Sequence, residues 1–141
     1  MVKEGEEAPK FRLMSDKGAF VSLDEFNGRK VVLYFYPKDD TPGCTKEACS
    51  FRDSNDLFLE KGAAVIGISA DDSESHLRFR SKYNLPFYLL SDSDHKVMEA
   101  YGAWEEKVIR STFVIDEKGK IIKVFPKVVP ENHAQDVLKY L

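Results

Sequence analysis

The chain has 141 residues, and 43% hydrophobic, 12% aromatic and 32% charged residues are ordinary proportions for a globular protein, so we expect one domain spanning residues 1–141. A net charge of −3 leaves no basic excess, which argues against nucleic acid as a partner. No apolar run approaches the ~20 residues of a membrane span, and Met1 to Glu6 lack the pattern of a signal peptide. We therefore expect a cytoplasmic protein with no membrane partner.

A β-hairpin is the first predicted element. Phe11–Leu13 and Phe20–Ser22 flank the turn residues Ser15–Gly18, and we expect this hairpin to cover an edge of the core. A short turn over Leu23–Phe26 follows. Lys30–Tyr36 is then a near-continuous apolar run, which is typical of a strand buried on both faces.

The longest predicted helix begins at Gly43 and continues to about Lys61, where Gly62 ends it. The side chains expected to face the core from this helix are Ala48, Phe51, Leu57, Phe58 and Leu59.

Strands and helices alternate through the rest of the chain. The predicted elements are a strand at Ala63–Ser69, a helix at Glu74–Lys82 with Ser73 as N-cap, a strand at Phe87–Leu90, a short helix ending at Tyr101–Gly102, a hairpin of Thr112–Ile115 with Lys120–Phe125, and a final helix capped by Asn132 with Val137, Leu138 and Leu141 on one face. This order predicts an α/β fold with a mixed central sheet and helices on both faces.

The residues that carry chemistry lie between the first buried strand and the long helix. Pro37, Thr41 and Cys44 stand in a P-x-x-x-T-x-x-C spacing, and Glu47 follows one helical turn later. Cys44 falls in the first turn of the predicted helix, where free N–H groups and a partial positive charge stabilise a thiolate. The only other cysteine, Cys49, is five residues away, and in a reducing compartment such a pair favours a catalytic or transient role.

The segment Pro37–Cys49 resembles the active-site motif of the peroxiredoxins, and in particular their peroxiredoxin Q, or bacterioferritin comigratory protein, branch. The similarity extends from Gly5–Pro9 to Arg110–Asp116. It implies a thioredoxin-like fold and a peroxidase that reduces hydrogen peroxide and organic hydroperoxides through a sulfenic acid on Cys44. It also implies thioredoxin or a similar thiol as reductant, with no cofactor and no metal.

The resemblance also implies roles for individual side chains. Lowering a thiol pKa from about 8.5 to about 6 raises the thiolate fraction at pH 7 roughly thirtyfold, or about 2 kcal/mol, whereas enzymes supply at least ~8 kcal/mol. Thr41 and Arg110 are therefore the expected catalytic donors, with a loop or cap hydrogen bond as the alternative for Thr41. The residues expected around the substrate are Pro37, Gly43, Glu47 and Trp104. A solvated carboxylate is the alternative for Glu47, which could otherwise orient Arg110, and core packing is the alternative for Trp104.

Cys49 is the candidate resolving cysteine. On an intact helix, Cα atoms five residues apart lie near ~8.6 Å, whereas a disulfide needs ~4.4–6.8 Å, so the pair joins only if this turn unwinds. The alternative is an inert Cys49 and an external resolving thiol. Because an internal disulfide needs no second subunit, we expect a functional monomer.

The segment between Trp104 and Arg110 departs from the family pattern. Only Glu105–Ile109 separate Trp104 from Arg110, whereas the family generally carries a longer segment there, which leaves the placement of Arg110 open.

A thioredoxin-like disulfide oxidoreductase is one alternative function, but it is expected to have C-x-x-C and a proline where Ser111 stands. A redox-sensing or chaperone module is another. The remaining polar candidates, expected to be solvated or capping rather than metal ligands, are Asp39, Asp40, His76, His95 and His133.

Overall fold

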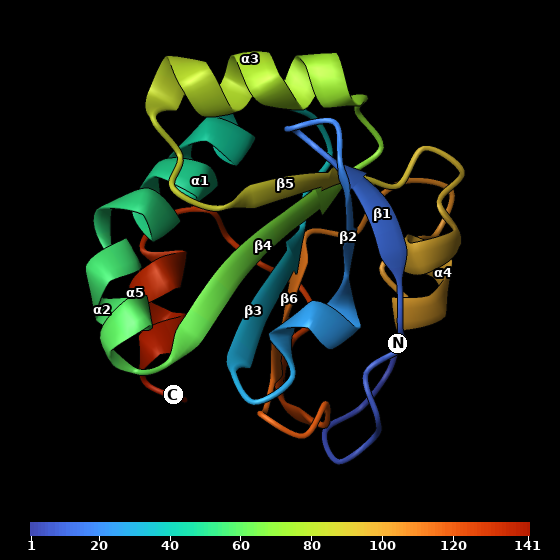
Figure 1. Ribbon diagram of the computed structural model, residues 1–141, viewed down its shortest axis with the longest axis vertical. Helices are drawn as coiled ribbons and strands as arrows, with labels where there is room; N and C mark the ends of the chain where they lie inside the picture. Colours follow the sequence, from blue (N-terminus) through green and yellow to red (C-terminus); the bar gives the residue numbers. More distant parts are fainter.

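The computed structural model describes all 141 residues. Its elements, shown in Figure 1, are β1 (Arg12–Ser15), β2 (Phe20–Ser22), the 3₁₀ helix η1 (Leu23–Phe26), β3 (Lys30–Phe35), α1 (Pro42–Asp53), α2 (Asn55–Glu60), β4 (Ala63–Ser69), α3 (Ser73–Tyr83), β5 (Tyr88–Ser91), α4 (Lys96–Tyr101), β6 (Ser111–Ile115), β7 (Ile121–Phe125) and α5 (His133–Leu138). No helix combines the length and the apolar composition needed to cross a bilayer.

All seven strands form one mixed sheet in the order β2-β1-β5-β4-β3-β6-β7. The central strands β3, β4 and β5 are parallel, while β6 and β7 extend the sheet antiparallel on the β3 side. The predicted N-terminal hairpin extends the other side, where Met14 and Ser15 pair with β5. The predicted α/β fold with a mixed sheet is thus confirmed.

The core has two layers because side chains alternate across the buried strands. In β3, Val31, Leu33 and Phe35 belong to the cluster that includes α4 and η1. Val32 and Tyr34 belong to the opposite cluster, which packs against α1, α2, α3 and α5. Figure 1 shows these four helices on one side of the sheet and α4 on the other, so helices cover both faces as predicted.

The prediction of one helix from Gly43 to Lys61 is wrong in one respect, because the observed helix is interrupted at Ser54 (φ −102°, ψ 6°). The interruption lies in the run Asp53–Asp56, whose short polar side chains compete with the helix for backbone hydrogen bonds. It changes which side chains face inward: Phe58 is buried, but Leu57 and Leu59 are 48% and 51% exposed rather than part of the core.

Two predicted caps also differ in the structure. Asp72, not Ser73, caps α3, since its carboxylate accepts from the Ser75 amide at 2.8 Å. The Ser73 hydroxyl instead donates to the carbonyl of Ser15 at 2.9 Å. Asn132 stands at the start of α5 with a left-handed backbone, but its side chain makes no capping hydrogen bond.

Candidate active site

Cys44 lies at the carboxyl end of the central strand β3, in the first turn of α1. Thr41 is the N-cap, and the first bond within the helix runs from the Thr45 amide to the Thr41 carbonyl at 2.8 Å. The amides of Gly43 and Cys44 precede that bond and have no backbone acceptor. The Cys44 side chain is 1% exposed, so its sulfur lies under the surface at the positive end of the helix.

Arg110 reaches this sulfur from the segment just before β6, the strand next to β3. It directly precedes β6, whose first residue, Ser111, pairs with Phe35 at the end of β3. Its Nη2 donates to the Sγ of Cys44 at 3.3 Å, and its Nη1 donates to the Oε1 of Glu47 at 2.7 Å. The strand order therefore brings together two residues that are 66 positions apart.

Burial affects the charges of Glu47 and Arg110. Glu47 is fully buried, and desolvation raises its pKa to about 7 although Arg110 pulls it in the opposite direction. Its Oε2 has no hydrogen-bond partner. Burial acts to lower the pKa of Arg110, but the negative charges of Glu47 and Cys44 raise it above its ordinary value. The guanidinium therefore stays charged beside the sulfur.

The short segment before Arg110 closes as a tight turn. Trp104 pairs with Val108, and the Ile109 amide donates to the Ala103 carbonyl at 2.8 Å. The carbonyl of Arg110 then accepts from the amide of Val128 at 2.9 Å. Five residues are thus enough to return the chain to the start of β6, and the shortened segment leaves Arg110 in contact with Cys44.

Gly43 leaves room for that contact. A Cβ atom on Gly43 would lie 3.3 Å from the Nη2 of Arg110 and 3.5 Å from the Cγ of Pro130. A side chain here would press directly on the guanidinium, so the absence of one at Gly43 leaves Arg110 its space.

Thr41 lies in the loop as predicted, but its hydroxyl donates to the carbonyl of Lys38 at 2.8 Å. The hydroxyl proton is thus used in a hydrogen bond within the loop, and only the lone pairs of the Thr41 hydroxyl oxygen are free to accept another.

Pro37 and Trp104 lie together, in a surface groove of about 520 Å³ that Cys44 does not line. Pro37 is exposed, and Trp104 is half-buried with its ring stacked on His95 at a centroid distance of 3.8 Å.

Cys49 occupies a different face of α1. It is half-buried and lines a groove of about 480 Å³ between α1 and α5, together with Lys46 and Gln135. Burial and the nearby Asp53 raise the pKa of its thiol, against the influence of Arg52. Both cysteines are free, and the intact helix holds their sulfurs on separate sides.

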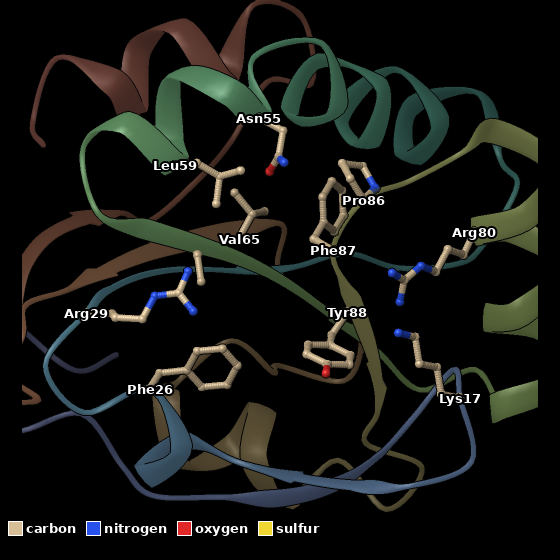
Figure 2. Close-up of a pocket in the computed structure, with 11 residues that line it drawn as sticks. Lys17, Phe26, Arg29, Asn55, Leu59, Val65, Arg80, Pro86, Phe87 and Tyr88 are labelled. Atoms are coloured by element: carbon tan, nitrogen blue, oxygen red, sulfur yellow. The ribbon is translucent and has the colours of Figure 1, made fainter.

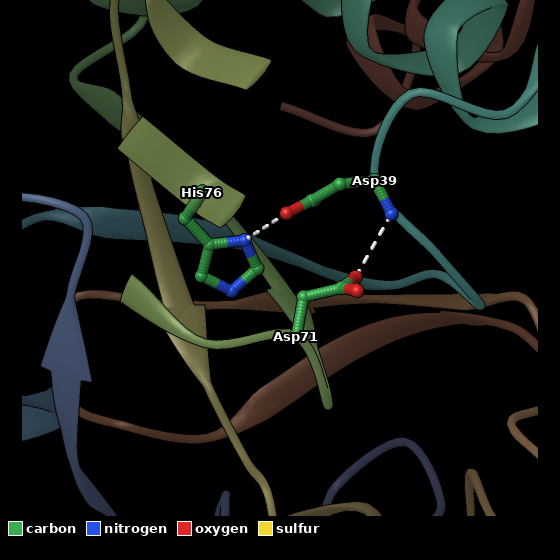
Figure 3. Close-up of side chains that lie close together, drawn as sticks. All are labelled: Asp39, Asp71 and His76. Carbon is green, nitrogen blue, oxygen red and sulfur yellow. Dashed lines mark hydrogen bonds and ion pairs between the residues drawn. The ribbon is translucent and has the colours of Figure 1, made fainter. Parts of the chain in front are cut away.

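The sequence reasoning missed a buried polar network under the loop. His76 is fully buried and Asp39 is 7% exposed, so the expectation that both are solvated or capping is wrong. Figure 3 shows Asp39 between His76 and Asp71. These groups are close enough to suggest a metal site. However, the Oδ2 of Asp39 lies 2.7 Å from the Nδ1 of His76, and the Oδ2 of Asp71 accepts from the hydroxyl of Ser69 and the amide of Asp39, so the groups already have hydrogen-bond partners. The helical spacing of His76 with buried Phe79 was the available signal.

His133 is also buried, contrary to expectation. Burial lowers its pKa to about 4, and its Nε2 lies 2.7 Å from the hydroxyl of Thr112 in β6. It is therefore a neutral core histidine that joins α5 to the sheet.

A separate hollow of about 290 Å³ opens between α2, α3 and η1 (Figure 2). Its walls combine the rings of Phe26, Phe87 and Tyr88 with the cations of Lys17, Arg29 and Arg80. None of the predicted site residues lines it.

Comparison with known proteins places these features in a family. Residues 5–124 match the model of the AhpC/TSA family. The chain is 49% identical to the putative peroxiredoxin bcp of Coxiella burnetii, with 97% of each protein covered, and 45% identical to the peroxiredoxin Bcp of Bacillus subtilis, with 99% of this chain and 95% of that protein covered. The crystal structure of peroxidoxin BcpB from Mycobacterium tuberculosis superposes with a TM-score of 0.94 at 34% identity, over 99% of this chain and 96% of that one.

Proposed function

Because this chain belongs to the AhpC/TSA family, as a peroxiredoxin of the Bcp and peroxiredoxin Q type, and is thus a thiol-dependent peroxidase, we propose that Cys44 is the thiol that attacks the peroxide. The observation that carries this assignment is the 3.3 Å contact between the Arg110 guanidinium and the Cys44 sulfur. A thiolate beside a permanent cation at a helix N-terminus is nucleophilic at neutral pH.

In the first step, the Cys44 thiolate attacks one oxygen of hydrogen peroxide or an organic hydroperoxide. The S–O bond forms as the O–O bond breaks, and the electron pair leaves with the second oxygen, which takes up a proton to become water or an alcohol. Arg110 and the free amides of Gly43 and Cys44 are the donors that stabilise the leaving oxygen. Thr41 accepts a hydrogen bond from the peroxide through its free lone pairs.

The other expected site residues act around this centre. Glu47 orients Arg110 through their 2.7 Å contact, and Gly43 leaves the guanidinium space. Pro37 and Trp104 offer an apolar wall for the organic part of a hydroperoxide, which is supported by the groove that they share next to the loop.

In the second step, the Cys49 thiolate attacks the Cys44 sulfur. The S–S bond forms as the S–O bond breaks, and the leaving hydroxide takes up a proton from solvent to become water. The resulting disulfide is reduced by a dithiol donor of the thioredoxin type. The step requires α1 to unwind between the cysteines. The contact of this turn with the segment before α5 is weak, since the Lys46–Glu131 ion pair is exposed. Unwinding must also release buried Glu47 from its 2.7 Å contact with Arg110.

We place the enzyme as a monomer in the cytoplasm. Both cysteines of the cycle are on one chain, so no second subunit is needed, and a reducing compartment keeps both thiols free between turnovers. Sedimentation at working concentration checks the first point, and an obligate dimer would contradict it.

The roles of the two thiols are tested by mass spectrometry after stoichiometric peroxide. Wild type should lose two protons without gaining oxygen, Cys44→Ser should consume no peroxide, and Cys49→Ser should stop at sulfenic acid and proceed to sulfinic acid in excess peroxide. Activity in Cys44→Ser would overturn the assignment of Cys44. Normal turnover of Cys49→Ser, with no internal disulfide in wild type, would make this a one-cysteine peroxidase.

A further inference from the structure

We propose that Asp39 and His76 are positioning residues of the peroxide-reducing site. Their buried pair holds the Pro37–Thr41 loop, and with it the first turn of α1, so that Cys44 and Arg110 remain in contact although the following turn must unwind. This inference rests on the proposed function, because it concerns the geometry in which Cys44 reacts.

Asp39 is held by hydrogen bonds from both its side chain and its backbone amide, although it lies in a loop. Its Oδ1 accepts from the hydroxyl of Tyr36 at 2.6 Å, and its Oδ2 accepts from the hydroxyl of Ser75 at 2.8 Å and lies 2.7 Å from the Nδ1 of His76. Its amide donates to the Oδ2 of Asp71 at 2.8 Å. Figure 3 shows the carboxylate pointing away from the helix toward His76, so Asp39 anchors the loop to the body of the protein.

His76 links this anchor to the sheet. Its Nε2 lies 3.0 Å from the carbonyl of Leu90 in β5, and a carbonyl can only accept, so Nε2 carries a proton. Its Nδ1 lies 2.7 Å from the Oδ2 of Asp39. In a fully buried site, the loss of this hydrogen bond leaves an unpaired polar group.

The anchor lies outside the part of α1 that has to move. Asp39 is followed by Asp40, with a left-handed backbone (φ 56°), and then by the N-cap Thr41 and by Pro42, which has a fixed φ. Fixing Asp39 therefore sets where the first turn of α1 begins. The partners of Asp39 lie directly after β3, in α3 and in the β4–α3 loop, and none of them is in the turn between Cys44 and Cys49. The turn that must unwind can open without breaking the anchor.

Asp40 provides a matched control in the same loop. Its carboxylate contacts Lys82 at 2.8 Å and Tyr83 at 2.9 Å, but this pair is exposed and contributes little. Asparagine tolerates the left-handed backbone, so Asp40→Asn removes a neighbouring charge without disturbing the loop.

The experiment measures three quantities on reduced protein: the rate constant of Cys44 with hydrogen peroxide, the later rate of disulfide formation, and amide exchange. Misplacing reacting groups by ~1 Å can cost on the order of 10²-fold. We expect Asp39→Ala to slow the peroxide step by about 10- to 100-fold. Exchange should rise from Asp39 to Thr45 but not in β3 and β4, and disulfide formation should be as fast as in wild type or faster. Asp40→Asn should react within about twofold of wild type.

Conservative variants separate positioning from general stability. His76→Asn keeps a donor toward Asp39, whereas His76→Gln keeps the one toward Leu90, so the first should retain the faster peroxide step. Equal rates in Asp39→Ala and wild type would overturn the inference, as would a slower peroxide step accompanied by increased exchange throughout the core. If Asp39→Ala does not fold, Asp39→Asn decides: a loss of threefold or more relative to Asp40→Asn supports the anchor, and an equal rate refutes it. Failure of wild type to consume peroxide would instead refute the proposed function.

Discussion

Replacing Glu47 with glutamine should change how stability depends on pH. Burial raises the pKa of Glu47 from 4.5 to about 7, so between these values the folded protein holds a proton that the unfolded chain has released. Stability from this group is therefore greatest at low pH and is lost as pH rises toward 7. At about 1.4 kcal/mol per pKa unit, the whole change is roughly 3 kcal/mol, and about 2.5 kcal/mol of it falls between pH 5 and pH 8.

Glutamine cannot ionise, so Glu47→Gln should lack this loss while keeping an acceptor for Arg110. The assay is urea unfolding of reduced wild type and Glu47→Gln at pH 5, 6, 7 and 8. All other titrating groups, including buried His133, are common to both proteins, so the difference between the two curves reports Glu47 alone. We expect the variant to gain roughly 2–3 kcal/mol relative to wild type from pH 5 to pH 8. Parallel curves would refute the reasoning, because Glu47 would then be ionised at an ordinary pKa despite its burial.

Two further predictions concern the neighbours of Cys44. Arg110→Ala should slow the peroxide step by 10²-fold or more, because it removes the donor that we propose for the leaving oxygen, and raising the pH should not restore the rate. Full recovery at high pH would mean that Arg110 only favours the thiolate. Gly43→Ala should slow the same step several-fold, because the new Cβ atom would lie 3.3 Å from the Arg110 guanidinium and press on it. Urea unfolding should show a free energy of unfolding that is unchanged or higher by up to ~1 kcal/mol, since alanine favours a helix more than glycine does. A wild-type peroxide rate in Gly43→Ala would contradict the tight contact.

Apart from the division of the long helix into α1 and α2, the identity and order of the elements followed from the sequence alone. Apolar runs such as Lys30–Tyr36 mark buried strands, because the period of side-chain alternation and the β preference of the residues are local properties. The place of Cys44 in the first turn of a helix is also local, since Pro42 and Gly43 follow a strand and a polar loop. The break at Ser54 was missed although its signal, four short polar residues in a row, is present in the sequence.

The pairing of distant side chains was decided only by tertiary structure. Arg110 meets Cys44 because β6 lies beside β3 with Ser111 opposite Phe35, and strand order is a global choice that no local pattern encodes. The burial of a side chain likewise depends on which distant elements pack against it. Glu47 and Asp39 have the sequence context of solvated carboxylates. In the structure, Arg110 contacts Glu47 and His76 contacts Asp39, and both contacts come from other elements. The local sequence therefore put Cys44 in the first turn of a helix, and the packing of the sheet and helices set the charges and hydrogen bonds around it.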